Sequence, residues 1–147
     1  MATTLKPPPS AAREAQRLFF EIGMEHRKHI GAALGALELT FSQAHALRLL
    51  DPEQPLPMSA LAERLFCDAS NVTGIADRLE SRGLIERRAA EGDRRVKALV
   101  LTVAGTAMRK RVREIMSEPP AAIAALSASD QRALRDILAR AVEHLQS

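Results

Sequence analysis

The chain has 147 residues, 46% of them hydrophobic, and a formal net charge of +3 at pH 7. This length suits one domain, or one domain with an oligomerising extension, and the hydrophobic share is enough for a folded core, which excludes global disorder. A single cysteine, Cys67, excludes an internal disulfide framework and a zinc site built from several cysteines, and no apolar run approaches the ~20 residues of a membrane span.

The N-terminal part is predicted to contain one long helix. Residues 1–9 form a short, proline-rich leader without the apolar core of a signal peptide, so we expect a cytoplasmic protein. Ser10 is a suitable N-cap with Glu14 in the first turn, and the helix should run to about Leu37. Its apolar stripe is broad and includes Leu18, Phe19, Ile22, Met24, Ile30 and Leu34.

A shorter helix is expected next, with Ser42 as its N-cap. It should end at Leu50, because the proline-containing run over 51–55 cannot continue a helix. Residues 56–58 can form one short strand. Ser59 then caps a helix over 60–66, and Glu63 sits where it completes a capping box.

After a turn over 67–69, a second helix of this pair is predicted. Asp68 or Ser70 can cap it, and Gly83 supplies the left-handed residue after its end at Ser81 or Arg82. Apolar residues at i, i+3, i+4 and i+7 give this helix one buried face, made of Val72, Ile75, Ala76 and Leu79. The residues turned outward are Ser70, Asn71, Thr73, Gly74, Asp77 and Arg78.

A β-hairpin and two terminal helices complete the chain. The strands are predicted over 84–89 and 96–102, with 90–95 as the connecting tip. Thr102 should cap a helix over 103–118, which the two prolines at 119–120 interrupt. Residues 121–126 can add a helical turn, and Ser127 or Ser129 should cap a last helix to about Leu145.

The outward residues of the second helix of the pair have the chemistry of duplex recognition. Asn can bond bidentately to adenine, while Ser and Thr can donate or accept at base edges or phosphates. Recognition helices present their N-terminal residues to the major groove, and Ser70, Asn71 and Thr73 lie there. Arg78 is long enough for a guanine edge or a phosphate. The alternative for Ser70 and Asn71 is that they only cap the helix.

The hairpin tip is the second expected contact with DNA. Arg94, Arg95 and Lys97 lie in or beside it, and an arginine on such a turn can enter a narrow minor groove, where the negative potential is enhanced. Asp93 is negatively charged, so on a phosphate-binding surface it needs a cationic partner. We expect it to orient one of the arginines through a charge-assisted hydrogen bond. A flexible charged tip that touches nothing is the alternative.

The distribution of charge agrees with DNA binding, whereas enzyme motifs are missing. Residues 69–113 contain 11 Lys and Arg against 5 Asp and Glu, which is the footprint of a duplex binder, although a solvated basic face gives the same count. No Walker-type loop, GxGxxG or GxSxG occurs, so we expect neither an enzyme nor a cofactor. The lack of Trp and Tyr argues against single-strand binding by stacking.

Several short motifs resemble the winged helix-turn-helix regulators of the MarR family. They are Leu-Glu-x-x-Gly-Leu-Ile-x-Arg at 79–87, Asp-x-Arg at 93–95, Leu-Thr at 101–102 and Gly105. The resemblance covers roughly 41–113. It implies a mostly α fold with a small β-hairpin, in which a winged helix-turn-helix is flanked by N- and C-terminal dimerisation helices.

The resemblance also implies a function for these residues. It implies a homodimer that binds a pseudo-palindromic operator in double-stranded DNA, usually as a repressor. Carried over by position, Arg95 resembles the family's minor-groove wing arginine and Asp93 its orienting carboxylate. The recognition-helix surface is matched by Ser70, Asn71, Thr73 and Arg78.

Four parts of the chain are predicted on this basis: a flexible leader (1–9), an N-terminal dimerisation helix (10–40), a DNA-binding lobe (41–103) and C-terminal dimerisation helices (104–147). The terminal helices carry more apolar surface than a compact lobe can cover, so pairing with a second copy is the natural way to bury it. The alternative is that they fold back on their own core.

The predicted regulatory input is a small molecule. The family often binds aromatic or anionic effectors between the dimer helices and the DNA-binding lobe, and His26, Arg27, His29 and His45 lie in segments that would border such a crevice. His26 and His29 have a spacing that can chelate metal, but no cysteine or carboxylate completes a set, so no metal site is predicted. We interpret Cys67 as a packing residue, because reactive thiols need an accessible, electropositive setting. Some relatives sense peroxide through a cysteine in the first helix, which has none here.

The sequence therefore predicts a ligand-responsive, homodimeric repressor that binds double-stranded DNA without membrane contact. One alternative is a metal- or redox-sensing regulator of the same fold. Another is a winged helix used as a protein–protein module, whose affinity for its partner would lack the steep salt dependence of phosphate neutralisation.

Overall fold

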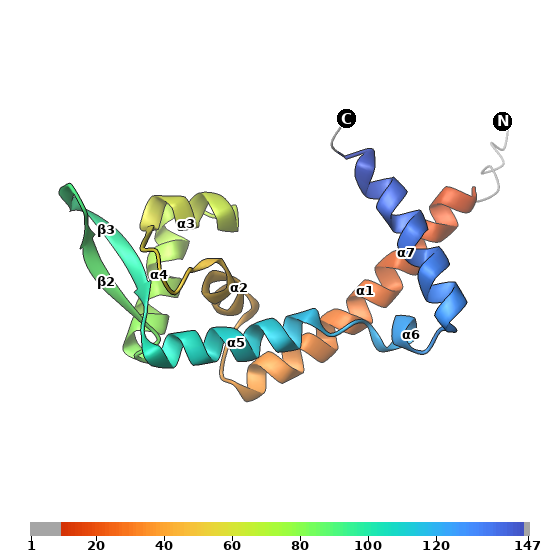
Figure 1. Ribbon diagram of the computed structural model, residues 1–147, viewed down its shortest axis with the longest axis horizontal. Coiled ribbons are helices and arrows are strands. Elements are labelled where there is room, and N and C mark those ends of the chain that lie inside the picture. The colour runs from red at the N-terminus through yellow and green to blue at the C-terminus, as the bar shows by residue number, and fades with distance from the viewer. Residues whose placement is uncertain (1–9, 146–147) are drawn as a thin grey trace, which may run out of the picture. The chain divides into compact units, whose positions relative to one another are not determined.

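The computed structural model describes residues 10–145 and is mostly helical with one small antiparallel sheet, as predicted (Figure 1). The helices are α1 (Ala11–Ala36), α2 (Phe41–Leu49), α3 (Met58–Leu65), α4 (Ala69–Ser81), α5 (Val103–Ser117), α6 (Ala121–Ala124) and α7 (Ala128–Glu143). The strands are β1 (Leu56–Pro57), β2 (Ile85–Ala90) and β3 (Asp93–Leu101). The predicted leader over 1–9 lies outside the described residues.

The chain divides into two compact units, which we describe separately. One unit comprises Met1–His29 with Pro119–Ser147, and the other comprises Ile30–Glu118. We call the second unit the lobe. It extends beyond the predicted 41–103 region at both ends, because Ile30, Leu34 and Val112 are buried in its core.

The core of the lobe is built from every one of its main elements. Fully buried leucines come from α1, α2, α3, α4 and β3, and they are Leu34, Leu47, Leu61, Leu79 and Leu99. Burying one such side chain contributes about 1.5–3 kcal/mol to folding. Within the described residues, no polar or charged residue is buried in this core. Packing of apolar side chains therefore fixes how α4 sits on the lobe.

The sheet has the strand order β1-β3-β2, and both pairs are antiparallel. In β1, Leu56 pairs with Leu99, so the predicted short strand is present. The β2–β3 hairpin follows α4 directly, through Gly83, whose φ of +69° is the left-handed conformation expected at a helix C′ position. The hairpin tip extends away from the helices of the lobe (Figure 1).

The helix caps confirm some predictions and correct others. Asp68 and Thr102 cap α4 and α5 as expected. The cap of α2 is Thr40, not Ser42: its hydroxyl accepts from the Gln43 backbone N–H, and the Gln43 side chain accepts from the Thr40 N–H.

The start of α3 also differs from the prediction. The helix begins at Met58, and Pro57 occupies the N-cap position without a side-chain hydrogen bond. Proline suits this place because its φ is already near the helical value and it has no N–H to satisfy. Ser59 is therefore inside the first turn, and the predicted capping box with Glu63 is not formed.

The other unit contains the N-terminal part of α1 together with α6 and α7. Ser127 caps α7, since its hydroxyl accepts from the Asp130 N–H at 3.1 Å. Among the residues of this unit that the structure describes, none is buried. Its apolar stripes on α1 and α7 are exposed. No helix in the described part of the chain is both long and apolar enough to cross a membrane.

Candidate nucleic-acid interface

The N-terminus of α4 is held by one carboxylate. Oδ1 of Asp68 accepts a hydrogen bond from the Asn71 backbone N–H at 2.9 Å and another from the Ser70 hydroxyl at 2.7 Å. These bonds, the Asn71 N–H first, lower the pKa of Asp68 below its ordinary value. Ser70 is thus part of the capping arrangement, and its oxygen lone pairs stay available to a donor outside the chain.

The outer side of α4 carries the residues that we predicted to meet DNA. Asn71, Thr73, Gly74 and Arg78 are exposed. The Thr73 hydroxyl donates to the Ala69 carbonyl at 2.9 Å, which fixes its rotamer and leaves its oxygen as an acceptor. A Cβ at Gly74 would have no neighbour within 4 Å, so the helix does not need glycine there for its own packing.

The opposite side of α4 is fixed in the lobe. Val72, Ala76 and Leu79 are buried and Ile75 is half-buried, which confirms the predicted apolar face. Because this face cannot rotate without exposing the core, the polar face keeps one direction relative to the rest of the lobe.

An arginine that the sequence analysis named only as the last residue of the motif at 79–87 joins the hairpin to α4. Arg87 of β2 is only 22% exposed, and its guanidinium forms ion pairs with Glu80 at 2.6 Å and Asp77 at 2.5 Å. Its backbone N–H also donates to Glu80 at 3.0 Å. The two carboxylates raise the pKa of Arg87, Asp77 having the larger effect. Asp77 was predicted only as an outward residue, and the structure shows it bridging to β2.

The hairpin differs from its predicted form. Only Glu91 and Gly92 connect the strands, with Gly92 at a φ of +85°. Ala90 pairs with Asp93, whereas Ala89 pairs with Lys97, so three residues of β3 (94–96) bulge out of the register. Arg94 and Arg95 therefore lie on a bulge inside β3 and not on a six-residue tip. A bulge of this kind bends the strand and redirects its side chains.

Asp93 contacts Arg95, but through the main chain. Its Oδ1 accepts from the Arg95 backbone N–H at 2.9 Å, whereas we expected a bond to a guanidinium. This contact shapes the bulge and leaves the Arg95 side chain exposed. Arg94 and Lys97 are exposed as well, and no ion pair is formed by these three cations within the described part of the chain.

The base of the hairpin is closed by the motif at 101–105. The Thr102 hydroxyl donates to the Gly83 carbonyl at 2.6 Å and accepts from the Gly105 N–H at 2.9 Å. A Cβ at Gly105 would lie 1.8 Å from the Leu84 carbonyl oxygen, so only glycine fits. The end of α4, the start of β2 and the start of α5 therefore meet at one fixed corner.

Arg82, at the C-terminus of α4, connects this corner to the turn that follows α1. Its guanidinium donates to the carbonyls of Glu38 at 2.8 Å and Leu37 at 3.0 Å, just after the C-terminus of α1. Glu38 has a φ of +55°, in the left-handed region. Arg82 thus gives hydrogen-bond partners to two carbonyls in the turn that follows α1. A long-range contact of this type has no signal in the local sequence.

The residues predicted for an effector pocket are not brought together in one unit. His26, Arg27 and His29 belong to the unit made of Met1–His29 and Pro119–Ser147, whereas His45 lies half-buried on α2 in the lobe. Across residues 10–145, no group of three His, Cys, Asp or Glu side chains is placed to hold a metal ion. The Cys67 thiol is half-buried and free.

Comparison with known proteins agrees with this geometry. The family model described as "MarR family" matches residues 39–97, which contain α2, α3, α4 and most of the hairpin. The organic hydroperoxide resistance transcriptional regulator of Bacillus subtilis is 30% identical over 98 residues, which are 67% of this chain and 67% of the relative. The HTH-type transcriptional repressor Rv2887 of Mycobacterium tuberculosis is 28% identical over 122 residues, covering 82% of this chain and 88% of the repressor.

Solved structures show the same fold. MepR, a transcription regulator of the Staphylococcus aureus multidrug efflux pump MepA, aligns with a TM-score of 0.77 at 21% identity, over 88% of this chain and 97% of MepR. A MepR mutant bound to an oligodeoxyribonucleotide aligns with a TM-score of 0.67 at 24% identity, over 89% of this chain and 97% of the mutant. The winged helix-turn-helix of the lobe, the family match over it and the curated relatives agree: this chain belongs to the MarR family.

Proposed function

We propose that the protein is a sequence-specific regulator of transcription that binds double-stranded DNA as a homodimer. The observation that carries this proposal is the joint placement of α4 and the hairpin. The exposed polar side of α4 and the arginines of the bulge belong to elements that Arg87 ties together. In this arrangement α4 enters the major groove, and Arg95 reaches the adjacent minor groove.

Individual residues have distinct parts in this proposal. Asn71 and Thr73 read base edges, and Ser70 contacts a base or a phosphate at the N-terminus of α4. Arg78 contacts a guanine or a phosphate. On the hairpin, Arg94, Arg95 and Lys97 supply positive charge, while Asp93 shapes the bulge that presents them.

The exposed apolar surface of the other unit supports dimerisation. Phe19 and Phe20 of α1 are 66% and 65% exposed, and the stripe on α7 is exposed too. Large apolar side chains in water on a unit without any buried residue, among those described, favour association with a second copy. Two lobes then bind half-sites about one helical turn, ~34 Å, apart, which is why the operator is expected to be pseudo-palindromic.

The regulatory part of the proposal is repression relieved by a small effector. The relative in M. tuberculosis is named a repressor, and the same action is proposed here. An aromatic or anionic effector would act by changing the spacing of the two recognition helices. The dimer fits its operator in one spacing only, so such a change releases the DNA. The proposed place of action is the cytoplasm.

Selection of genomic fragments with the purified protein tests DNA binding directly. We expect one or a few sites with two inverted half-sites, and an affinity that falls steeply with salt. Arg95→Ala should weaken binding to the selected site by about 1–3 kcal/mol. Asn71→Ala should reduce discrimination between this site and random DNA more than it reduces affinity for random DNA. Unchanged affinity and salt slope in Arg95→Ala would show that the hairpin does not enter the groove.

A further inference from the structure

One residue without a side chain, Gly74, lies at the middle of the outward side of α4. Two residues along an α-helix correspond to a rotation of about 200°, so Gly74 is nearly opposite both Val72 and Ala76, which are buried in the lobe. Gly74 itself is exposed. The part of α4 that faces directly away from the core is therefore bare backbone.

The fold of the lobe does not require a glycine at this position. A Cβ at Gly74 would meet no atom within 4 Å. In the described part of the chain, the glycines with a positive φ are Gly83 and Gly92, so Gly74 has a backbone conformation that other residues also adopt. Glycine inside a helix is less favourable than alanine. Because neither packing nor conformation calls for glycine here, its role lies in what α4 contacts.

We propose that Gly74 leaves room for the 5-methyl group of a thymine and so determines part of the operator sequence. This rests on the proposed function, in which the outward side of α4 faces the floor of the major groove. Gly74 lies inside α4, where the helix uses its backbone N–H and C=O, so it offers a ligand only its apolar Cα hydrogens. Polar atoms of a base edge need hydrogen-bond partners, whereas the thymine methyl group is apolar and needs none.

Polar side chains surround Gly74 without covering it. Ser70 and Asn71 lie one turn before it and Arg78 lies one turn after it, all of them exposed. No side-chain atom of these residues is within 4 Å of the position of a Cβ on Gly74. Asn71 and Arg78 can therefore bond the polar edges of neighbouring bases, while the bare position between them accepts the methyl group.

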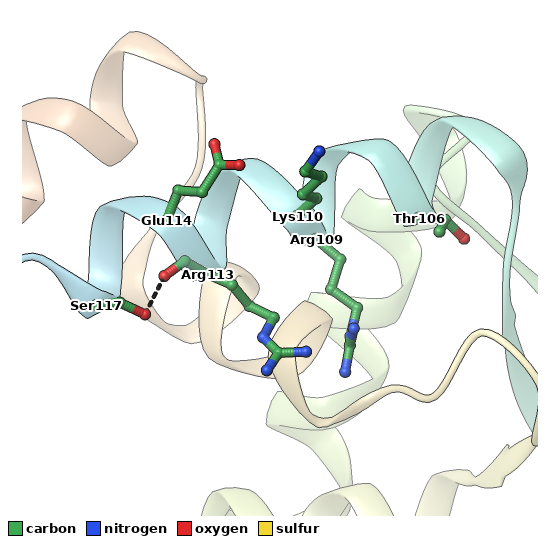
Figure 2. A pocket seen from close by; sticks show the side chains of 6 residues that line it. All are labelled: Thr106, Arg109, Lys110, Arg113, Glu114 and Ser117. Atoms are coloured by element: carbon green, nitrogen blue, oxygen red, sulfur yellow. Dashed lines mark hydrogen bonds between the residues drawn. The ribbon is translucent and has the colours of Figure 1, made fainter.

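A charged hollow elsewhere on the lobe supplies a control for general attraction to DNA. It runs along α5 and is lined by Thr106, Arg109, Lys110, Arg113, Glu114 and Ser117. Lys110 extends to the side of α5 opposite to Arg109 and Arg113 (Figure 2). Lys110→Gln removes one positive charge and changes no residue of α4, so it should alter the affinity for all sequences by the same factor.

The test uses the full chain and the site that the wild type selects. Copies of this site carry deoxyuridine, which lacks only the 5-methyl group, in place of the same thymine in both half-sites. At one position, the wild type should bind the copy about 15-fold more weakly, because each of two lost methyl contacts weakens binding about 4-fold. Gly74→Ala should bind the unmodified site at least about 30-fold more weakly, since two methyl groups are forced against two others. It should bind the deoxyuridine copy at that position more tightly than the unmodified site, which reverses the wild-type preference.

Gly35→Ala on α1 is the matched control for the substitution. Gly35 is also helical, exposed and inside the lobe, and a Cβ there would meet no atom within 4 Å. Gly35→Ala and Lys110→Gln should both keep the wild-type preference for thymine. Gly74→Ala should be at least as stable as the wild type in urea, so its loss of affinity is not a loss of fold. Its salt slope should equal that of the wild type, because no charge is changed.

Three results would overturn the inference alone. They are unchanged affinity of Gly74→Ala for the unmodified site, a loss of affinity that no deoxyuridine copy reverses, and an equal loss in Gly35→Ala. A wild type that selects no site at all would overturn the proposed function, and this inference with it.

Discussion

The tie between the hairpin and α4 can be tested by replacing Arg87 with methionine. Met keeps most of the length and the apolar stem but removes the ion pairs to Asp77 and Glu80. The Arg87 side chain is 22% exposed and its partners are 61% and 40% exposed, so the pairs are stronger than surface pairs but not fully desolvated. Exposed pairs contribute ~0.2–1 kcal/mol each, and hydrogen bonds to charged groups up to ~3. We expect Arg87→Met to lower the free energy of unfolding by about 1–2 kcal/mol.

The adjacent residue in the sequence gives a control for the loss of charge. Within residues 10–145, Arg88 pairs only with Glu86, at 2.8 Å, and both side chains are more than half exposed (62% and 55%). Arg88→Met should therefore change the free energy of unfolding by less than about 0.5 kcal/mol. Urea unfolding followed by circular dichroism measures both variants under identical conditions.

DNA binding separates a positioning role for Arg87 from a direct contact. Freed from α4, the hairpin has to be ordered on binding, so we expect Arg87→Met to bind the operator about 5- to 20-fold more weakly. Its salt slope should equal that of the wild type, because Arg87 neutralises no phosphate. Equal stability of the Arg87→Met and Arg88→Met variants would refute the tie, and a slope reduced by about one would make Arg87 a phosphate contact.

Three further outcomes are expected. Gly105→Ala places a methyl group 1.8 Å from a backbone carbonyl oxygen and should destabilise the lobe by about 1–3 kcal/mol or more. Its control is Gly74→Ala, whose methyl group meets no atom within 4 Å and should stabilise the lobe by about 0.5–1 kcal/mol. The same urea assay measures both variants. Phe66→Gly should raise stability by about 0.5–1 kcal/mol, because Phe66 has a φ of +52° and its side chain is 96% exposed; a loss of stability would show that the ring packs on something. Asp68 has a folded pKa below its ordinary 3.8, so its stabilising effect is present above that pH and is lost as the pH falls through the folded pKa. Asp68→Ala should therefore weaken the acid dependence of unfolding, and an unchanged pH profile would contradict this assignment.

The exposed face of α4 could be predicted because the helical repeat determines which residues share a face. The positions of Val72, Ala76 and Leu79 leave a single way to bury the helix, and every polar residue between them turns outward. Asp68 as the N-cap follows from local chemistry of the same kind. These features depend on residues within one or two helical turns of each other. Interactions over so short a separation can be predicted from the sequence alone.

The cap of α2 was predicted wrongly although its signal was present. Thr40 and Ser42 both carry a hydroxyl suited to an N-cap. Gln43 decides between them, since it lies three residues after Thr40 and completes a capping box with it. The spacing to a Glu or Gln was therefore more informative than the identity of the hydroxyl residue.

The hairpin shows what the sequence could not supply. The sequence pattern, with a glycine in the connection, predicted two strands joined by a basic tip. The three-residue bulge at 94–96 arises because Lys97 pairs with Ala89 while Asp93 pairs with Ala90, and no local pattern shows this register. The partners of Arg87 likewise lie seven and ten residues away, and other carboxylates are as close in sequence. Pairing of this kind is chosen by the packed lobe and not by local preference.

The contacts within the lobe limit how a ligand can change DNA binding. Arg87 joins β2 to α4, and the Thr102–Gly105 corner joins the hairpin base to α5, so α4 and the strands of the hairpin move together. A ligand that relieves repression has to favour a different state, and a rigid lobe offers none by itself. We therefore expect derepression to come from a change in the spacing of two lobes and not from a change inside one lobe.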